Sequence, residues 1–208
     1  MMSRPAVINA LNMVDLAGKD GIVSESSPGV FLQVFLYSLE HKVPVVAFSQ
    51  DRCLTIFDHP MVDSLHTVYH EPKAEVVPSI EQLLAEVDVQ KLIFLATAET
   101  VATTLRPHWS KVTKGRAGVV QAQPDMLEIL PSGVSKGLGV KMLLDHLGVK
   151  AEEVMAIGDG ENDVEMLQSA SLGVVLENGM EMAKAVANAV AASNDEDGVA
   201  DAIYRYAF

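Results

Sequence analysis

The sequence predicts an α/β fold in its C-terminal part and a mixed α+β region before it. From residue 135 onward, short apolar segments alternate with segments of helical periodicity, which is typical of a parallel sheet covered on both faces. The earlier part combines several short strand-like segments with fewer helices. Pro124 and Pro131 bracket the last of these strands. We therefore expect two domains, residues 1–130 and residues 131–208.

The first region contains a segment, residues 7–26, that resembles two strands around a Gly-Lys-Asp-Gly turn. Its further predicted elements are a helix at 29–42, strands at 43–49 and 91–96, a helix at 99–109, and strands at 117–122 and 125–130. Short strands interleaved with helices in this way are typical of an α+β domain.

The second region begins with a helix at 135–148, whose apolar positions recur at helical spacing and whose end is marked by Gly148. The later elements are strands at 153–157, 172–177 and 189–193, and helices at 161–170, 181–189 and 197–207. This order predicts the parallel sheet.

The composition narrows the class of protein. The chain has 208 residues, of which 49% are hydrophobic, and its net charge is -13. Such acidity argues against nucleic acid and anionic membranes as partners, since phosphate groups are bound by Lys and Arg. One cysteine, Cys53, excludes an intrachain disulfide. Without a signal peptide or a long apolar run, we expect a soluble, intracellular, cytoplasmic protein, with organelle import open if the chain is N-terminally truncated.

An acidic loop follows the first strand of the second region. The stretch AIGDGENDVEML, residues 156–167, carries Asp159 and Asp163 at the carboxyl end of a predicted strand, where open α/β sheets bind ligands. Two carboxylates completed by water are a usual way to hold Mg²⁺. The flanking glycines allow a close approach of the backbone, and Asn162 offers a neutral donor to a phosphate oxygen.

The loop departs from two other ligand-binding motifs. It is not an EF-hand, because Val164 stands where Gly is required and Ala170 where Glu is required. A dinucleotide-binding fingerprint is disfavoured because Asp163 occupies the third glycine position and would repel a pyrophosphate. A helix N-terminus with an acidic first turn remains the alternative without a ligand.

Lys136 favours a phosphate site. It lies at the start of the helix before the acidic loop, so it should reach the same edge of the sheet. A cation at a helix N-terminus opposes the helix dipole, and neutralising a phosphoryl group would explain its placement, although an ordinary surface lysine is the alternative.

The segments SKG (135–137), AIGDGENDVEMLQSASLGVVLENG (156–179) and SNDEDGVADAI (193–203) resemble the C-terminal half of the haloacid dehalogenase superfamily, in its Cof-type branch. The preceding residues resemble that branch's α+β cap domain. The resemblance implies an HAD-like core, incomplete in its N-terminal half, and a Mg²⁺-dependent phosphatase acting on a small phosphorylated metabolite through an aspartyl-phosphate.

In that resemblance, Lys136 matches the lysine that stabilises the intermediate and Asn162 a phosphate contact. Asp159 and Asp163 match the acids that hold Mg²⁺, directly or through water and neighbouring groups. Where members usually have Gly-Asn-Ala after the second strand, this chain has Glu177-Asn178-Gly179.

The family's D-x-D-G-T nucleophile motif is absent. The nearest segment is DLAGK, in which Asp15 takes the first position but Ala17 replaces the second aspartate. Asn9 and Asn12 are polar for a central strand, so we assign this segment to the cap hairpin and expect the chain to begin after the nucleophile strand.

Two functions follow as hypotheses: an incomplete or inactive phosphatase, or a non-catalytic protein that retains metal, phosphate or partner binding. Without the nucleophile strand, residues 154–157 should form a bare sheet edge that promotes self-association. Elsewhere, we expect no zinc helix at His66 and His70, an inert Cys53, and a turn with a helix cap rather than a metal site at NDEDG, residues 194–198.

Overall fold

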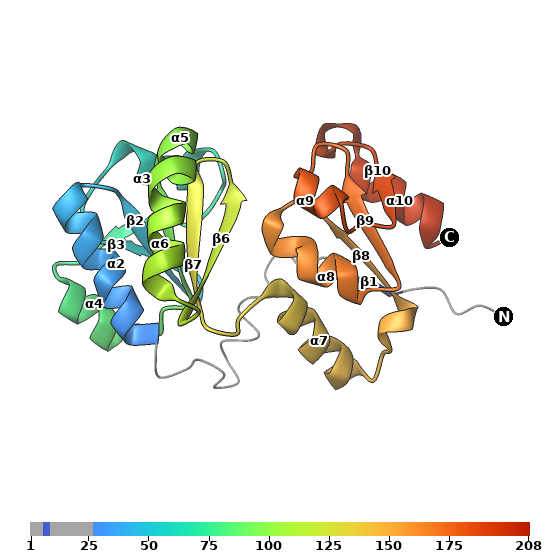
Figure 1. The fold of residues 1–208 in the computed structure, drawn as a ribbon, viewed down its shortest axis with the longest axis horizontal. Coiled ribbons are helices and arrows are strands. Elements are labelled where there is room, and N and C mark those ends of the chain that lie inside the picture. The colour runs from blue at the N-terminus through green and yellow to red at the C-terminus, as the bar shows by residue number, and fades with distance from the viewer. Residues whose placement is uncertain (1–5, 9–26) are drawn as a thin grey trace. The chain divides into compact units, whose positions relative to one another are not determined.

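The computed structural model describes residues 6–8 and 27–208 (Figure 1). These residues form two compact units. The core unit contains 6–8 and 135–208, and the cap unit contains 27–134. The division after Val134 lies close to the boundary expected near 131, but residues 6–8 belong to the core unit, where the sequence interpretation had placed them in the cap. None of the helices in these described ranges is long and apolar enough to cross a membrane.

The cap unit is built on a six-stranded sheet of order β4-β3-β2-β5-β7-β6. Its strands are β2 (Val45–Ser49), β3 (Arg52–Thr55), β4 (Glu75–Val76), β5 (Lys91–Leu95), β6 (Ala117–Gln123) and β7 (Met126–Pro131). Neighbouring strands are antiparallel except for β3 and β4, which run parallel. The mixed sheet confirms the α+β character expected of this region.

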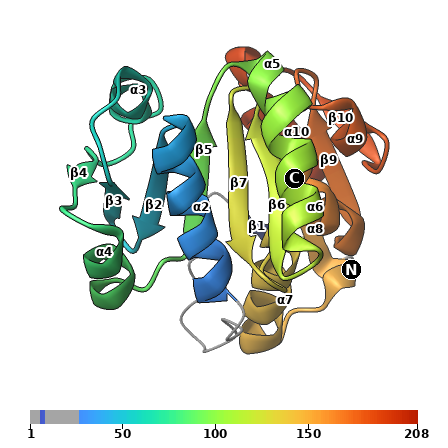
Figure 2. The same cartoon turned by 60° about the vertical axis from the view of Figure 1, so that its left-hand side comes forward.

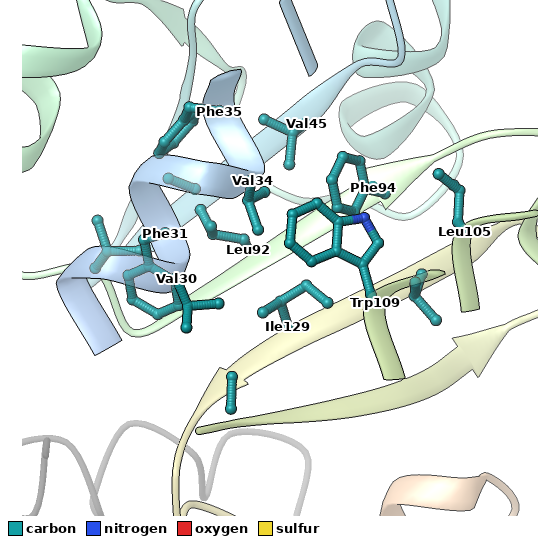
Figure 3. Close-up of a cluster of buried hydrophobic side chains, with 14 of the residues drawn as sticks. Val30, Phe31, Val34, Phe35, Val45, Leu92, Phe94, Leu105, Trp109 and Ile129 are labelled. Atoms are coloured by element: carbon teal, nitrogen blue, oxygen red, sulfur yellow. The ribbon is translucent and has the colours of Figure 1, made fainter. Parts of the chain in front are cut away.

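Helices cover both faces of the cap sheet. They are α2 (Ser27–His41), α3 (Pro60–Thr67), α4 (Ile80–Glu86), α5 (Ala98–Thr100) and α6 (Arg106–Thr113), with a π-helical turn at Val101–Leu105 between α5 and α6. Figure 2 shows α2 and α6 in front of the strands. Trp109 of α6 packs there against Phe94, Leu105 and Ile129, with Val34 of α2 in the same cluster (Figure 3). Helix α3 packs against alternate residues of β2 and β5 on the other face.

The core unit contains a four-stranded parallel sheet of order β1-β8-β9-β10. Its strands are β1 (Ala6–Ile8), β8 (Val154–Gly158), β9 (Leu172–Leu176) and β10 (Ala189–Ala191). Its helices are α7 (Lys136–Leu147), α8 (Val164–Ser169), α9 (Glu181–Lys184) and α10 (Gly198–Tyr206). Side chains of β8 alternate between two clusters, one with α7, α8 and α9 and the other with α10. The predicted parallel sheet covered on both faces is confirmed.

The expectation of a bare edge at residues 154–157 is wrong. Strand β1 pairs with β8 in parallel, with Ala6 opposite Val154 and Ile8 opposite Ala156. A three-residue apolar strand is too short to show a period from which it could be assigned. Asn9 and Asn12, which follow it, are polar for a central strand and favoured a cap hairpin. Self-association through β8 therefore loses its premise, because β8 has a strand on each side.

Other differences concern short elements. The helix expected at 181–189 ends at Lys184, and its last expected residue, Ala189, belongs to β10. The sequence interpretation did not include β3, β4, α3 or α4. By contrast, α7 matches closely: Ser135 caps its start by accepting a hydrogen bond from the Leu138 amide, and Gly148 ends it in the left-handed conformation.

Candidate functional site

The carboxyl end of β8 leads directly into the acidic loop. Asp159 follows Gly158, a 3₁₀ turn spans Glu161–Asp163, and α8 starts at Val164. Helix α7 begins at Lys136, on the same face of the sheet as α8. The strand-to-helix connection thus brings polar groups from two helix starts to one edge of the sheet, as expected for a ligand site in an open α/β fold.

Asp163 is the centre of the hydrogen-bond network. Its Oδ1 accepts a hydrogen bond from Lys136 Nζ at 2.7 Å. Its Oδ2 accepts from the Asp159 amide at 2.9 Å and from the Gly160 amide at 3.0 Å. The Asp163 side chain is only 5% exposed and that of Lys136 17%. Three donors, one of them charged, satisfy this buried carboxylate, as such a group requires.

Gly158 makes the approach of Asp163 possible. A Cβ added to Gly158 would lie 2.5 Å from Asp163 Cβ and 2.6 Å from its Cγ, which no real side chain tolerates. Gly160 is less restricted, because its Cβ position lies 2.8 Å from Asn162 Oδ1, the end of a side chain that can turn away. Gly158 therefore allows the Asp163 side chain to pack closely against the end of β8. The close approach of the backbone to a ligand, which the sequence suggested for both glycines, stays a prediction.

Asp159 differs from Asp163 in its surroundings. Its carboxyl is half-buried, and its pKa is raised above the ordinary value, first by burial and then by the Asp163 carboxylate, while Lys136 partly opposes the rise. Its backbone is held as well, since the Met180 amide donates to the Asp159 carbonyl oxygen at 2.8 Å. Ionisation of the Asp159 carboxyl is unfavourable beside a second carboxylate, and a nearby cation would stabilise the ionised form.

The structure therefore brings together Lys136, Asp159 and Asp163. The side chain of Asn162 is partly exposed and lies back against Gly160. Among the described residues, no group of three or more His, Cys, Asp and Glu side chains could hold a metal ion. The donor set suits Mg²⁺ bound by one carboxylate, Asp159, with water or phosphate oxygens completing it. The two oxygens of Asp163 already accept three hydrogen bonds, from Lys136 Nζ and from the Asp159 and Gly160 amides.

The sequence drew attention to the loop after β9 through its departure from Gly-Asn-Ala, but its contact with Asp159 was not predicted. Gly179 is buried, and a Cβ on it would lie 3.2 Å from Asp159 Cα. Together with the Met180 amide, this places Gly179 and Met180 directly against Asp159. The departure from Gly-Asn-Ala at residues 177–179 was the signal that pointed to this loop.

A family model described as haloacid dehalogenase-like hydrolase matches residues 15–203. The chain belongs to that family. The resemblance to its Cof-type branch is thereby confirmed, together with the HAD-like α/β fold. From Bacillus subtilis, YxeH, which is named as a candidate phosphatase, is 32% identical over 189 residues, or 88% of this chain and 68% of YxeH. A haloacid dehalogenase-like hydrolase from Bacteroides thetaiotaomicron has a similar crystal structure, with a TM-score of 0.70, 26% identity, and 86% and 66% of the two chains covered.

A longer relative comes from Arabidopsis thaliana. The protein named "Endoribonuclease YBEY, chloroplastic" is 60% identical over 230 residues. The match covers 99% of this chain but only 39% of the Arabidopsis protein, so the present HAD-like region spans well under half of it. The aligned stretch is also longer than the 208 residues of this chain, so the relative has residues within it that this chain lacks.

The lesser sequence predictions can now be placed. Cys53 is buried, and burial raises the pKa of its thiol to about 12, in keeping with an inert cysteine. His66 lies in the eight-residue helix α3, and His70 follows it in the left-handed conformation. Residues 194–198 form the expected turn and the start of α10, but Asp197 at the N-cap makes no capping hydrogen bond with its side chain. Asp15 lies outside the described residues.

Proposed function

We propose that the loop after β8 is a Mg²⁺-dependent phosphoryl-binding site of a phosphatase acting on a small phosphorylated metabolite. The observation that carries this proposal is the network of Lys136, Asp163 and Asp159 at the carboxyl end of β8. The names of relatives support the phosphatase class: one is a 5-amino-6-(5-phospho-D-ribitylamino)uracil phosphatase, YitU of Bacillus subtilis, 42% identical over 39% of this chain and 30% of YitU.

Each residue has a distinct role in this proposal. Asp159 binds the cation, which polarises a phosphoryl oxygen when bound. Lys136 neutralises charge on the phosphoryl group from its place at the start of α7. Asp163 orients the Lys136 ammonium and fixes the Asp159 and Gly160 amides, and Asn162 donates to a phosphate oxygen after turning away from Gly160.

The described residues include no D-x-D-G-T aspartate to form a covalent phosphoenzyme, so we infer that this chain hydrolyses phosphate esters only at trace rates. Strand β1 adds one specific alternative. It runs parallel to β8, so its carboxyl end, Ile8, lies at the same edge as Asp159, and the segment with Asp15 follows along the chain. Asp15 is therefore the candidate nucleophile should turnover be found.

The test is Mg²⁺-dependent hydrolysis of p-nitrophenyl phosphate by the pure chain, alongside Asp159→Asn, Lys136→Ala and Asp15→Asn. We expect trace turnover by the unmodified chain and Mg²⁺ binding that Asp159→Asn abolishes. Robust turnover abolished by Asp15→Asn would overturn the inactive assignment and identify the nucleophile. Mg²⁺ binding unchanged in Asp159→Asn would remove the site from this loop.

The second candidate function is a non-catalytic protein that binds metal, phosphate or a partner. It is favoured by the same absent motif. Trace Mg²⁺-dependent turnover that Asp159→Asn removes would favour the phosphatase, and phosphate binding with no turnover above that of Asp159→Asn would favour this second function. Acidity argues for a small metabolite rather than nucleic acid or a membrane as the ligand. We propose two locations for the protein, the cytoplasm and a plastid. The plastid is supported by the name of the Arabidopsis relative, which describes it as chloroplastic.

A further inference from the structure

The turn at Ser193–Gly198 is held from several directions. The Gly198 amide donates to the Ser193 carbonyl oxygen at 2.9 Å, and Ser193 Oγ donates to Glu196 Oε2 at 3.0 Å. The packing is also tight, because a Cβ on Gly198 would overlap the Ala192 carbonyl. The Asp201 carboxylate of α10 accepts from the Ala192 amide at 3.3 Å. The turn is therefore a fixed support at the carboxyl end of β10.

This support is joined to the neighbouring loop by one side chain. The backbone N–H of Asn194 donates a hydrogen bond to the side-chain Oδ1 of Asn178 at 3.0 Å, which links the loop after β10 to the loop after β9. Both partners of this hydrogen bond are uncharged, and both residues are exposed. The contact depends on the amide oxygen of Asn178, at a position where an alanine would leave the Asn194 amide without this acceptor.

The loop after β9 is in turn joined to Asp159. The Gly179 amide donates to the Leu176 carbonyl oxygen at 2.9 Å and tightens the turn, and the next amide, of Met180, donates to the Asp159 carbonyl oxygen at 2.8 Å. Asn178 is thus two residues from the hydrogen bond that holds the Asp159 backbone. Two hydrogen bonds in series connect the Ser193–Gly198 turn to the proposed cation ligand.

We propose that Asn178 is a positioning residue for Asp159, with the Ser193–Gly198 turn as its support. This inference rests on the proposed function in assigning Mg²⁺ to Asp159. It also gives the acidic NDEDG segment a role without a metal ion of its own. The carboxylate of Asp159 can face a cation at a fixed angle only if its backbone is held, and the Met180 amide is the contact that holds its carbonyl.

The chain offers a matched control. Asn188 Oδ1 accepts a hydrogen bond from the backbone amide of Gly173 at 2.7 Å, which is the same kind of bond. It joins the connection before β10 to the start of β9, at the end of that strand away from Asn178. Asn188→Ala therefore removes one asparagine-to-amide bond from the core unit without touching the Asp159 side. Asn178→Asp keeps the accepting oxygen and serves as the conservative variant.

The first measurement is Mg²⁺ affinity by titration calorimetry on the full chain and its variants. Asn178→Ala should weaken binding roughly three- to tenfold, the effect of losing one net hydrogen bond. Asn178→Asp should bind at least as tightly as the unmodified chain, and Asn188→Ala should bind equally well. Equal weakening in Asn178→Ala and Asn188→Ala would assign the effect to general loosening of the sheet and overturn the proposal.

The second measurement needs no metal. Amide hydrogen exchange in EDTA should be faster at Met180 in Asn178→Ala and unchanged there in Asn188→Ala. If Met180 exchange is unchanged in Asn178→Ala, the positioning role is refuted whatever the chain binds. If exchange responds as expected but the unmodified chain shows no Mg²⁺ binding, the support of the Asp159 backbone stands and the proposed metal site fails. The two ideas can therefore be rejected separately.

Discussion

Each unit of the molecule contains a largely buried pair of a lysine and a carboxylate, and the two pairs are built differently. In the core unit, Lys136 Nζ lies 2.7 Å from Asp163 Oδ1, and two backbone amides occupy the other oxygen. In the cap unit, Lys91 Nζ lies 3.5 Å from Glu128 Oε1 and 4.6 Å from the centre of the Phe48 ring. Only the core pair is hydrogen-bonded at short range.

The difference shows what a site requires beyond charge neutralisation. The cap pair balances its own charges, and the Phe48 ring adds a favourable contact with the ammonium group. The core pair fixes the direction of Lys136 and the path of the Asp159–Gly160 backbone. A second carboxylate, Asp159, lies beside the pair, and Lys136 compensates its charge only in part. A cation can bind where uncompensated negative charge is held in a fixed geometry.

The largest expected effect is the loss of the Asp163 charge. Asp163→Asn should lower the free energy of unfolding of the core unit by about 3 kcal/mol. The largely buried Lys136 loses its counter-ion, and the NH₂ group of the new side chain would face a hydrogen-bond donor where an oxygen now accepts. Glu128→Gln should cost about 1 kcal/mol or less, since its longer contact is weaker and Lys91 is 25% exposed. Urea unfolding compares the two variants. Equal losses would show that the short hydrogen bonds add nothing to the core pair.

A smaller loss should follow from filling the space beside Asp163. Gly158→Ala places a methyl group 2.5 Å from Asp163 Cβ, so the loop must shift at a cost of about 1–3 kcal/mol. The control is Gly29→Ala in α2, where an added Cβ meets nothing within 4 Å and should stabilise the helix by about 0.5–1 kcal/mol. Thermal unfolding measures both. A neutral Gly158→Ala would mean that Asp163 tolerates displacement.

How much of this comparison the sequence could predict depends on the kind of contact. Lys136, Asp159 and Asp163 were placed at one sheet edge because strand and helix periods locate the ends of elements. The direction of each bond could not be predicted, because Lys136 and Asp163 are 27 residues apart and periodicity does not give side-chain orientation. Strand β1 was misassigned because three residues are too few to show a period. The cap pair was not predicted at all, since Lys91 and Glu128 meet only through the pairing of β5 with β7.

Mg²⁺ should stabilise the chain through Asp159 alone. At ten times the dissociation constant, bound cation adds about 1.4 kcal/mol, which for a chain of this size raises the melting temperature by about 3–5 °C. Asp159→Asn should remove this response. The exposed Glu177→Gln in the neighbouring loop makes the same charge change and should keep it. A response lost in Glu177→Gln and kept in Asp159→Asn would move the cation to the loop after β9.

The smallest effect is the pH dependence of stability that Asp159 produces without metal. Burial and the Asp163 carboxylate raise the pKa of Asp159 in the folded chain, so the folded state binds this proton more tightly than the unfolded state does. Above the raised pKa, the ionised carboxyl destabilises the fold. As the pH falls through the raised pKa toward the ordinary 3.8, the carboxyl is protonated first in the folded state and this cost disappears.

Asp159→Asn should therefore melt slightly higher than the unmodified chain at pH 7 in EDTA, and the two melting temperatures should converge toward pH 4. Glu177→Gln, which removes one charge from an exposed position, controls for the general reduction in net charge. A gain in Asp159→Asn that is as large at pH 4 as at pH 7 would show that the substitution acts through packing and not through the ionisation of Asp159.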